Sequence, residues 1–293
     1  MTALTDVLLA PFEYQFMTRA LIATLVSSTV CALLSCWLVL IGWSLMGDAV
    51  SHAVLPGVVL AYIFGVPFAV GAAVFGFIAV GLIGAVRGTG QVKEDAAIGI
   101  VFTTLFALGL VLISVTPSNT DLNHIIFGNL LGVSGSDLVQ ISVLGFVVAS
   151  ALIVKRRDFT LYAFDPTHAH AIGLNPRRLG MALLGLLALT AVTALQVVGI
   201  VLVVAMLIIP GATARLLTDK FGHMLVIAPM LAASGGVVGL YISYYQDTSP
   251  GGMVVLSQGV VFAIVYLFGP AGGIVTTIVR AIRRRDRSPS SQP

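Results

Sequence analysis

The sequence predicts an all-α fold, a polytopic integral membrane helical bundle of eight or nine transmembrane helices, and three observations predict it. The chain is 58% hydrophobic, with a mean hydropathy of +1.06 over 293 residues. Only 9% of its residues are charged, whereas soluble domains carry about 25%. Long apolar runs alternate with short basic clusters, as in membrane proteins. This composition excludes a soluble globular enzyme, a disordered chain and a nucleic-acid-binding protein, although the pI is about 9.0.

Nine apolar runs are candidate helices, and most reach the ~20 residues that cross about 30 Å of hydrocarbon. In chain order they are residues 20–42, 49–65, 67–86, 96–116, 137–154, 179–195, 198–214, 224–245 and 253–279. A helix satisfies each backbone N–H and C=O within its own segment, as the bilayer requires. The runs 49–65 and 198–214 are short, and we expect Pro210-Gly211 to break the second. A short or interrupted segment can lie where the backbone meets a substrate path or a partner. Alternatively, it can be part of a pair of tilted helices joined by a tight turn.

The basic residues orient the chain. Fourteen of the 15 Lys and Arg follow the third, fifth, seventh and ninth runs: Arg87, Lys93, Lys155, Arg156, Arg157, Arg177, Arg178, Arg215, Lys220, Arg280, Arg283, Arg284, Arg285 and Arg287. By the positive-inside rule, these gaps and the C-terminus are cytoplasmic. Nine crossings then place the N-terminus outside, and eight place it inside. We expect one transmembrane domain over residues 1–280, with its largest cytoplasmic segment at 155–178, and a disordered cytoplasmic tail over 281–293.

Asp48 and His52 form an Asp/His pair in apolar surroundings. A charged residue inside a transmembrane segment costs about 2.5–3.5 kcal/mol on insertion scales, so it usually marks a pathway or a site. The spacing of four places both side chains on one helix face, where a carboxylate oxygen and an imidazole nitrogen can share a divalent cation. The alternative is an ion pair or hydrogen-bonded pair that only joins helices, and the spacing alone leaves both open.

Two further Asp/His pairs occur in the gaps between runs. Asp121 and His124 follow a turn-rich stretch in an outer gap, which suggests either an outer vestibule or, as we favour, a helix cap by Asp121. Asp219 and His223 lie in a basic inner gap, which predicts a solvated interface.

Catalytic motifs are missing from the sequence. It contains no G-x-x-x-x-G-K-[ST], H-E-x-x-H, G-x-S-x-G or C-x-x-C pattern, so a P-loop ATPase and the common hydrolase and redox sites are excluded. Cys31 and Cys36 are five residues apart on one predicted helix and point in different directions, which predicts two small core residues without a local disulfide.

Four stretches resemble the permease subunit of bacterial metal-ion ABC importers, the manganese, zinc and iron uptake class. They are residues 47–57 (GDAVSHAVLPG), 127–134 (FGNLLGVS), 164–175 (FDPTHAHAIGLN) and 198–215 (VGIVLVVAMLIIPGATAR). The similarity extends over residues 16–280, and the first and last stretches are the most specific. The resemblance implies the fold of an ABC importer permease that is not itself an enzyme. The missing P-loop is then expected, because ATP would be hydrolysed on a separate ATPase subunit.

The resemblance also implies partners and a location. A second permease, of the same or a related chain, would complete the pathway in the bacterial plasma (inner) membrane. A cytoplasmic pair of ATP-binding subunits would drive it, and an extracytoplasmic metal-binding protein would deliver the metal. A coupling helix would dock on the ATPase, beginning at Asp165-Pro166 and ending at Gly173. The residues implied for this role are Phe164, Asp165, Pro166, Ala169, Gly173 and Leu174.

The resemblance makes the divalent metal ion the cargo, and no cofactor is expected on this chain. Asp48 and His52 of two permeases would face the dimer axis and supply up to four oxygen and nitrogen ligands. Such ligands suit Mn²⁺, Fe²⁺ or Zn²⁺ better than Ca²⁺ or Mg²⁺. The overall resemblance favours manganese, with iron and zinc next. The alternatives are a proton-coupled secondary metal transporter, in which the pair relays protons, and an ABC permease for a chelated metal, which needs a wider aromatic-lined cavity.

Overall fold

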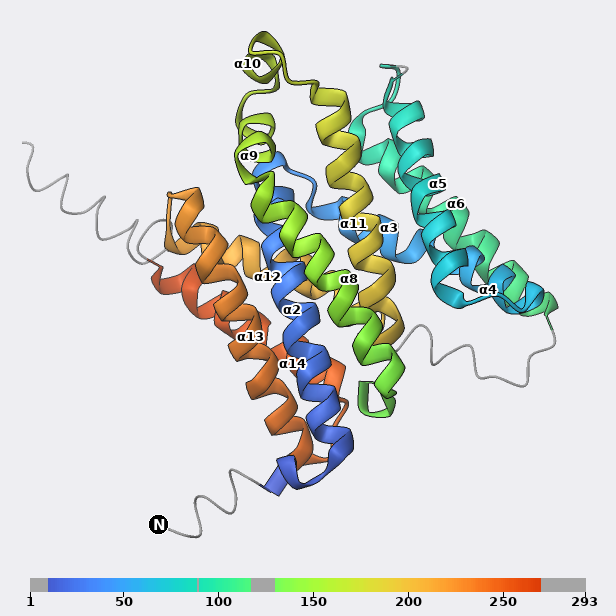
Figure 1. Ribbon diagram of the computed structural model, residues 1–293, viewed down its shortest axis with the longest axis vertical. Helices are drawn as coiled ribbons and strands as arrows, with labels where there is room; N and C mark the ends of the chain where they lie inside the picture. The colour runs from blue at the N-terminus through green and yellow to red at the C-terminus, as the bar shows by residue number, and fades with distance from the viewer. Residues whose placement is uncertain (1–9, 89, 117–129, 270–293) are drawn as a thin grey trace, which may run out of the picture.

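The computed structural model describes residues 10–88, 90–116 and 130–269, and every regular element within these ranges is a helix (Figure 1). The long helices are α2 (Gln15–Ile41), α5 (Phe68–Gly88), α6 (Glu94–Val115), α8 (Gly135–Val154), α11 (Pro176–Val198), α12 (Ile200–Leu217), α13 (Phe221–Gln246) and α14 (Pro250–Phe268). The shorter elements are η1 (Ala10–Glu13), α3 (Ser44–Ala53), α4 (Leu55–Phe64), η2 (Leu130–Gly132), α9 (Arg156–Phe164) and α10 (Pro166–Ala171).

The predicted all-α membrane bundle is confirmed. Within the described ranges, eight spans are long and apolar enough to cross a membrane when α3 and α4 are counted as one, and α12 supplies a shorter apolar helix. Each of the nine apolar runs coincides with a helix or a helix pair. The part of the ninth run after residue 269, and the predicted tail at 281–293, lie outside the described residues.

The expected break at Pro210-Gly211 is wrong. Helix α12 stays α-helical from Ile200 to Leu217, with Pro210 inside it. The helix lies close against α2, since a Cβ added at Gly211 would lie 2.7 Å from the carbonyl oxygen of Ser35. This packing holds α12 together where the proline removes a backbone donor.

The chain breaks in the other short segment instead. Val54 separates α3 from α4, and Pro56 is accommodated in the first turn of α4, where backbone N–H groups have no partner within the helix. At its other end α3 is separated from α2 by Gly42, whose φ of 87° is left-handed. Helix α3 is therefore a ten-residue unit, with a left-handed glycine before it and an interruption at Val54 after it.

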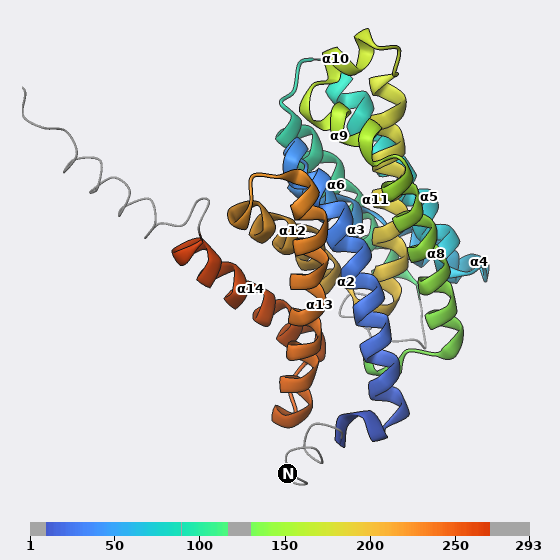
Figure 2. The same ribbon diagram turned by 60° about the vertical axis from the view of Figure 1, so that its left-hand side comes forward.

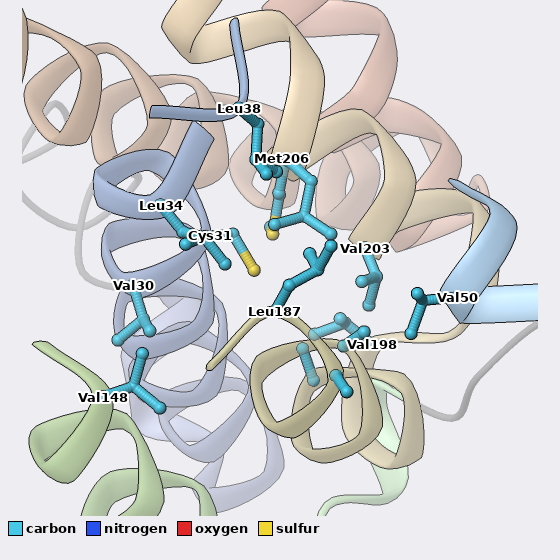
Figure 3. Packing of buried hydrophobic residues seen from close by; sticks show 14 of the residues in the cluster. Val30, Cys31, Leu34, Leu38, Val50, Val148, Leu187, Val198, Val203 and Met206 are labelled. Carbon is cyan, nitrogen blue, oxygen red and sulfur yellow. The ribbon is translucent and has the colours of Figure 1, made fainter. Parts of the chain in front are cut away.

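The hydrophobic core gathers around α2, which packs against α8, α12 and α13 (Figures 1 and 2). The buried side chains labelled in Figure 3 come from five helices: Val30, Cys31, Leu34 and Leu38 (α2), Val50 (α3), Val148 (α8), Leu187 and Val198 (α11), and Val203 and Met206 (α12). Cys31 and Cys36 are buried free thiols, as predicted. The inner face of α3 thus belongs to this core.

Glycine residues let neighbouring helices approach closely. Helices α4 and α5 meet at Gly57 and Gly71, where a Cβ added to Gly57 would lie 2.1 Å from the carbonyl oxygen of Gly71. Small residues serve this purpose in membranes because van der Waals packing, more than the hydrophobic effect, holds the helices together. Gly57 therefore fixes where α4 lies, directly after the short helix α3.

The two ends of the bundle differ in charge, as the positive-inside pattern predicts. Figure 1 shows α9, α10 and the link between α5 and α6 at its upper end, and these segments contain Arg87, Lys93 and the basic stretch 155–157. Element η1 and the turn between α13 and α14 lie at the lower end. The described chain begins at the end opposite these basic segments. Which end faces the cytoplasm stays a prediction.

Replacing Gly57 with Ala tests the close approach of α4 and α5. The added methyl group would collide with the Gly71 carbonyl, so the helices must separate, at a free-energy cost of about 1–3 kcal/mol. We expect the melting temperature of the detergent-solubilised protein to fall. Gly84→Ala in α5 is the matched control, because its Cβ would meet nothing within 4 Å. Equal melting temperatures for the two variants would contradict the packing described.

Candidate metal site

Helix α3 places Asp48 and His52 on one face, as their spacing predicts. The Nε2 atom of His52 lies 3.3 Å from Oδ1 of Asp48. The side chains are 26% and 34% exposed, respectively, so the pair is neither sealed in the core nor fully open. Leu45, three residues before Asp48 on the same face, is 55% exposed. The pair therefore lies on a partly exposed side of α3.

Two phenylalanines of α6 form a wall against the imidazole ring. The ring centroid of His52 lies 5.1 Å from that of Phe106, edge to face, and 5.6 Å from that of Phe102. Phe102 and Phe106 are four residues apart, so one face of α6 presents both. Contacts of this kind hold an aromatic ring in one orientation. The wall directs Nε2 of His52 toward Asp48.

The second ring nitrogen of His52 stands out. Its Nδ1 atom is buried and has no hydrogen-bond partner within the described part of the chain. Nearly all buried polar atoms in folded proteins have a partner, which makes this nitrogen unusual. Within the described residues, the ring of His52 contacts Asp48, Phe102 and Phe106.

Asp48 and His52 together offer one carboxylate and one imidazole. The described residues contain no group of three or more His, Cys, Asp or Glu side chains that is placed to hold a metal ion. Transition metals take four or more ligands, so a bound ion needs further donors from water, backbone or another chain. The exposed side of the pair leaves room for them.

The other two Asp/His pairs have different outcomes. Asp121 and His124 lie outside the described residues, so neither the vestibule nor the cap is tested. Asp219 lies 3.4 Å from Nη1 of Arg215 and is 82% exposed, and His223 is exposed as well. The interpretation of this pair as a solvated interface is confirmed.

The predicted coupling segment folds as the sequence indicates. Helix α10 begins at Pro166, and the Asp165 carboxylate accepts a hydrogen bond of 2.9 Å from the backbone N–H of His168. The segment turns at Gly173, whose φ of 90° is left-handed. Ala169 is fully buried, whereas Phe164, at the end of α9, is 63% exposed. Leu174 donates its backbone N–H to the carbonyl of Ala169. The local structure is confirmed, and the role in coupling stays a prediction.

Sequence reasoning missed Phe102, Phe106 and Trp43. In an apolar helix such as α6, two phenylalanines four residues apart are typical of any lipid-facing or core surface. Nothing in the pattern connects them with His52, about fifty residues earlier in the chain. Trp43 directly precedes α3, and its contacts with α5 and α9 come only from tertiary packing.

The fold and the site define a class: polytopic helical membrane proteins that carry a metal-type ligand pair on a short helix inside an apolar bundle. A sequence model of the ABC 3 transport family matches residues 13–269, which is most of the chain. The chain belongs to this family.

Relatives and a solved structure agree with this assignment. The chain is 48% identical to the manganese transport system membrane protein MntB of Synechocystis, over 92% of this chain and 88% of that protein. It is also 48% identical to a probable iron transport system membrane protein of Haemophilus influenzae, over 88% and 96%. The solved structure of PsaBC from Streptococcus pneumoniae, in complex with Fab, is similar with a TM-score of 0.85 and 35% identity, covering 95% of this chain and 99% of that one.

Phe106→Ala tests whether the aromatic wall orients His52. Loss of an edge-to-face contact worth about 1 kcal/mol should weaken Mn²⁺ binding about fivefold. Electron paramagnetic resonance of free Mn²⁺, during titration of the purified protein, measures the dissociation constant. The control is Phe146→Ala on α8, because that ring is 74% exposed and far along the chain from the pair. If both variants bind Mn²⁺ like the unaltered protein, the wall has no orienting role.

Proposed function

We propose that the chain is the membrane-spanning permease subunit of an ATP-driven importer for a divalent transition metal, manganese first and iron second. The observation that carries the proposal is the Asp48–His52 pair, held 3.3 Å apart on a partly exposed face of α3. Membership of the ABC 3 transport family and the names of the relatives support it. The transported ion is the cargo, and the chain needs no cofactor of its own.

The ligand chemistry supports a transition metal. A carboxylate oxygen and an imidazole nitrogen suit Mn²⁺, Fe²⁺ and Zn²⁺, whereas Ca²⁺ and Mg²⁺ prefer oxygen alone. Such a site would favour Zn²⁺ over Mn²⁺ by intrinsic affinity, so selectivity must come from geometry and from the protein that delivers the ion. Manganese and iron rank first because they appear in the relatives' names.

A second permease completes the site in this proposal. One chain supplies two ligands from its described residues, on a face that is partly exposed. A second copy, or a related chain, related by a two-fold axis would add the same pair from the other side. Two carboxylates and two imidazoles would then surround the ion, with water completing the shell.

The ATP-binding subunits would dock at the end of the bundle that carries α9 and α10. Beside α9 lies a hollow of about 570 Å³, lined by Arg156, Arg157, Thr160, Leu161, Phe164, Phe221, Gly222 and Leu225. The hollow is lined by apolar and basic side chains, so it suits a protein partner that presents a protruding apolar side chain surrounded by acidic residues. The end with these basic residues, and with it the C-terminus, would face the cytoplasm, and an extracytoplasmic metal-binding protein would deliver the ion at the opposite end.

The metal pair is tested by uptake in cells that depend on the transporter. We expect Asp48→Asn and His52→Gln each to lower Mn²⁺ uptake by at least about tenfold, because each replaces a carboxylate or imidazole ligand with a weaker neutral amide. Asp219→Asn and His223→Gln are matched controls, since they have the same spacing at an exposed position, and uptake should be retained. Full uptake by the Asp48 and His52 variants, at equal protein levels in the membrane, would refute the site.

The ATPase surface is tested by co-purification of the ATP-binding subunit. Phe164→Ala removes an exposed aromatic side chain at the junction of α9 and α10 and should lower the amount of ATP-binding subunit recovered. Phe146→Ala removes an even more exposed phenylalanine on α8 and should leave the recovery unchanged. A proton-coupled transporter predicts instead that uptake needs no ATP-binding subunit and stops when the proton gradient is collapsed.

A further inference from the structure

Helix α3 is a short element with a backbone break at each end. It is ten residues long, carries Asp48 and His52, and is separated from α2 by Gly42 and from α4 by Val54. A Cβ added at Gly42 would meet nothing within 4 Å, so no neighbouring atoms pack against the left-handed turn on that side. The core holds the inner face of α3 through Met46, Ala49 and Val50, and the contacts of Trp43 hold its first turn.

Trp43 holds that first turn. It is 4% exposed and caps α3, donating its backbone N–H to the carbonyl of Leu38 at 2.7 Å and accepting at 3.0 Å from the N–H of Met46. Its ring lies edge to face with Tyr162, with centroids 6.3 Å apart. The guanidinium of Arg87, at the end of α5, lies 5.7 Å from the centre of the same ring.

Tyr162 links Trp43 to the α9–α10 segment. It lies on α9, and only Asp165 stands between α9 and α10. Its hydroxyl is close to Gly180 on α11, where an added Cβ would lie 2.7 Å from the Tyr162 oxygen. The tyrosine ring is thus confined between Trp43 and α11, so a displacement of α9 presses on the indole.

The second tryptophan of the chain makes a different contact with α9. The indole N–H of Trp37 donates to Oγ1 of Thr160 at 3.3 Å, and its ring packs edge to face against Phe159 and Phe221. Trp37 lies inside the long helix α2, not at the start of α3. It joins α9 to α2 and provides an internal comparison for Trp43.

We propose that Trp43 and Tyr162 are positioning residues that set the placement of α3, and with it Asp48 and His52, from the α9–α10 segment. Asp48 lies five residues after Trp43, about 7.5 Å along the helix. Closely packed interfaces switch between discrete arrangements and deform little in between. A shift of α9 would therefore displace α3 through the contact between Tyr162 and Trp43. The inference rests on the proposed function, and it adds the contact through which events at the ATP-binding subunits reach the ligand pair.

The experiment measures Mn²⁺ taken up per ATP hydrolysed. The assembled transporter, with its ATP-binding subunits and metal-binding protein, is placed in proteoliposomes. Tyr162→Ala and Trp43→Ala should each lower this ratio at least fivefold, while ATP hydrolysis and subunit composition persist. Tyr162→Phe and Trp43→Phe keep an aromatic ring at the contact and should retain most of the ratio.

Two comparisons separate positioning from loss of structure. Trp37→Phe removes the hydrogen bond to Thr160 and should lower the melting temperature with the ratio within twofold of the unaltered transporter. The double variant Trp43→Ala/Tyr162→Ala should lose no more than the worse single variant, because both act through one contact. The inference would be overturned if the fold-loss in the double variant equalled the product of the two single losses. It would also be overturned if Trp37→Phe lowered the ratio of Mn²⁺ to ATP as much as Trp43→Ala does.

The failures of the two proposals are distinguishable. If the unaltered complex takes up neither Mn²⁺ nor Fe²⁺ when ATP is supplied, the proposed function fails. If the unaltered complex transports and Tyr162→Ala keeps its ratio of Mn²⁺ to ATP, only the positioning role fails.

Discussion

In hydrocarbon there is no water to accept hydrogen bonds from backbone N–H groups or to donate them to C=O groups, and the structure follows from this constraint. Long helices satisfy those groups internally, and the chain departs from helix only where the protein supplies a partner. At the end of α2, Trp43 donates its N–H to the carbonyl of Leu38. At the junction of α3 and α4, Val54 is fully buried and its carbonyl accepts from Val58. These enclosed breaks create the short helix that carries Asp48 and His52.

Close packing of the surrounding helices holds this short helix in a defined position. Gly57 against Gly71, and Gly211 against Ser35, bring backbones together so that the surrounding helices form a firm frame. Within that frame, Val50 fixes the inner face of α3 in the core, and the opposite face presents the polar pair. Placing a carboxylate and an imidazole in such a bundle costs free energy, and here the two groups contact each other while the imidazole also packs against Phe106.

Much of the fold was readable from local pattern. The nine apolar runs predict the helices because helix formation in a bilayer is a local matter of length and hydropathy. Asp165-Pro166 and Gly173 predict the ends of α10 because capping involves only neighbouring residues. The break predicted at Pro210-Gly211 does not occur, because a proline inside a helix is tolerated when neighbouring helices support it. Pro210 receives that support from α2.

The sequence by itself determined the membrane-spanning helices, the charge asymmetry of the two ends and the common helix face of Asp48 and His52, since each depends on composition or on spacing along one helix. Only the tertiary structure decided that α3 stands alone, that Phe102 and Phe106 enclose the imidazole, and that Trp43 meets Tyr162. These contacts join residues tens to more than a hundred positions apart. Their formation depends on how close glycines allow the helices to come, and no local pattern records that distance.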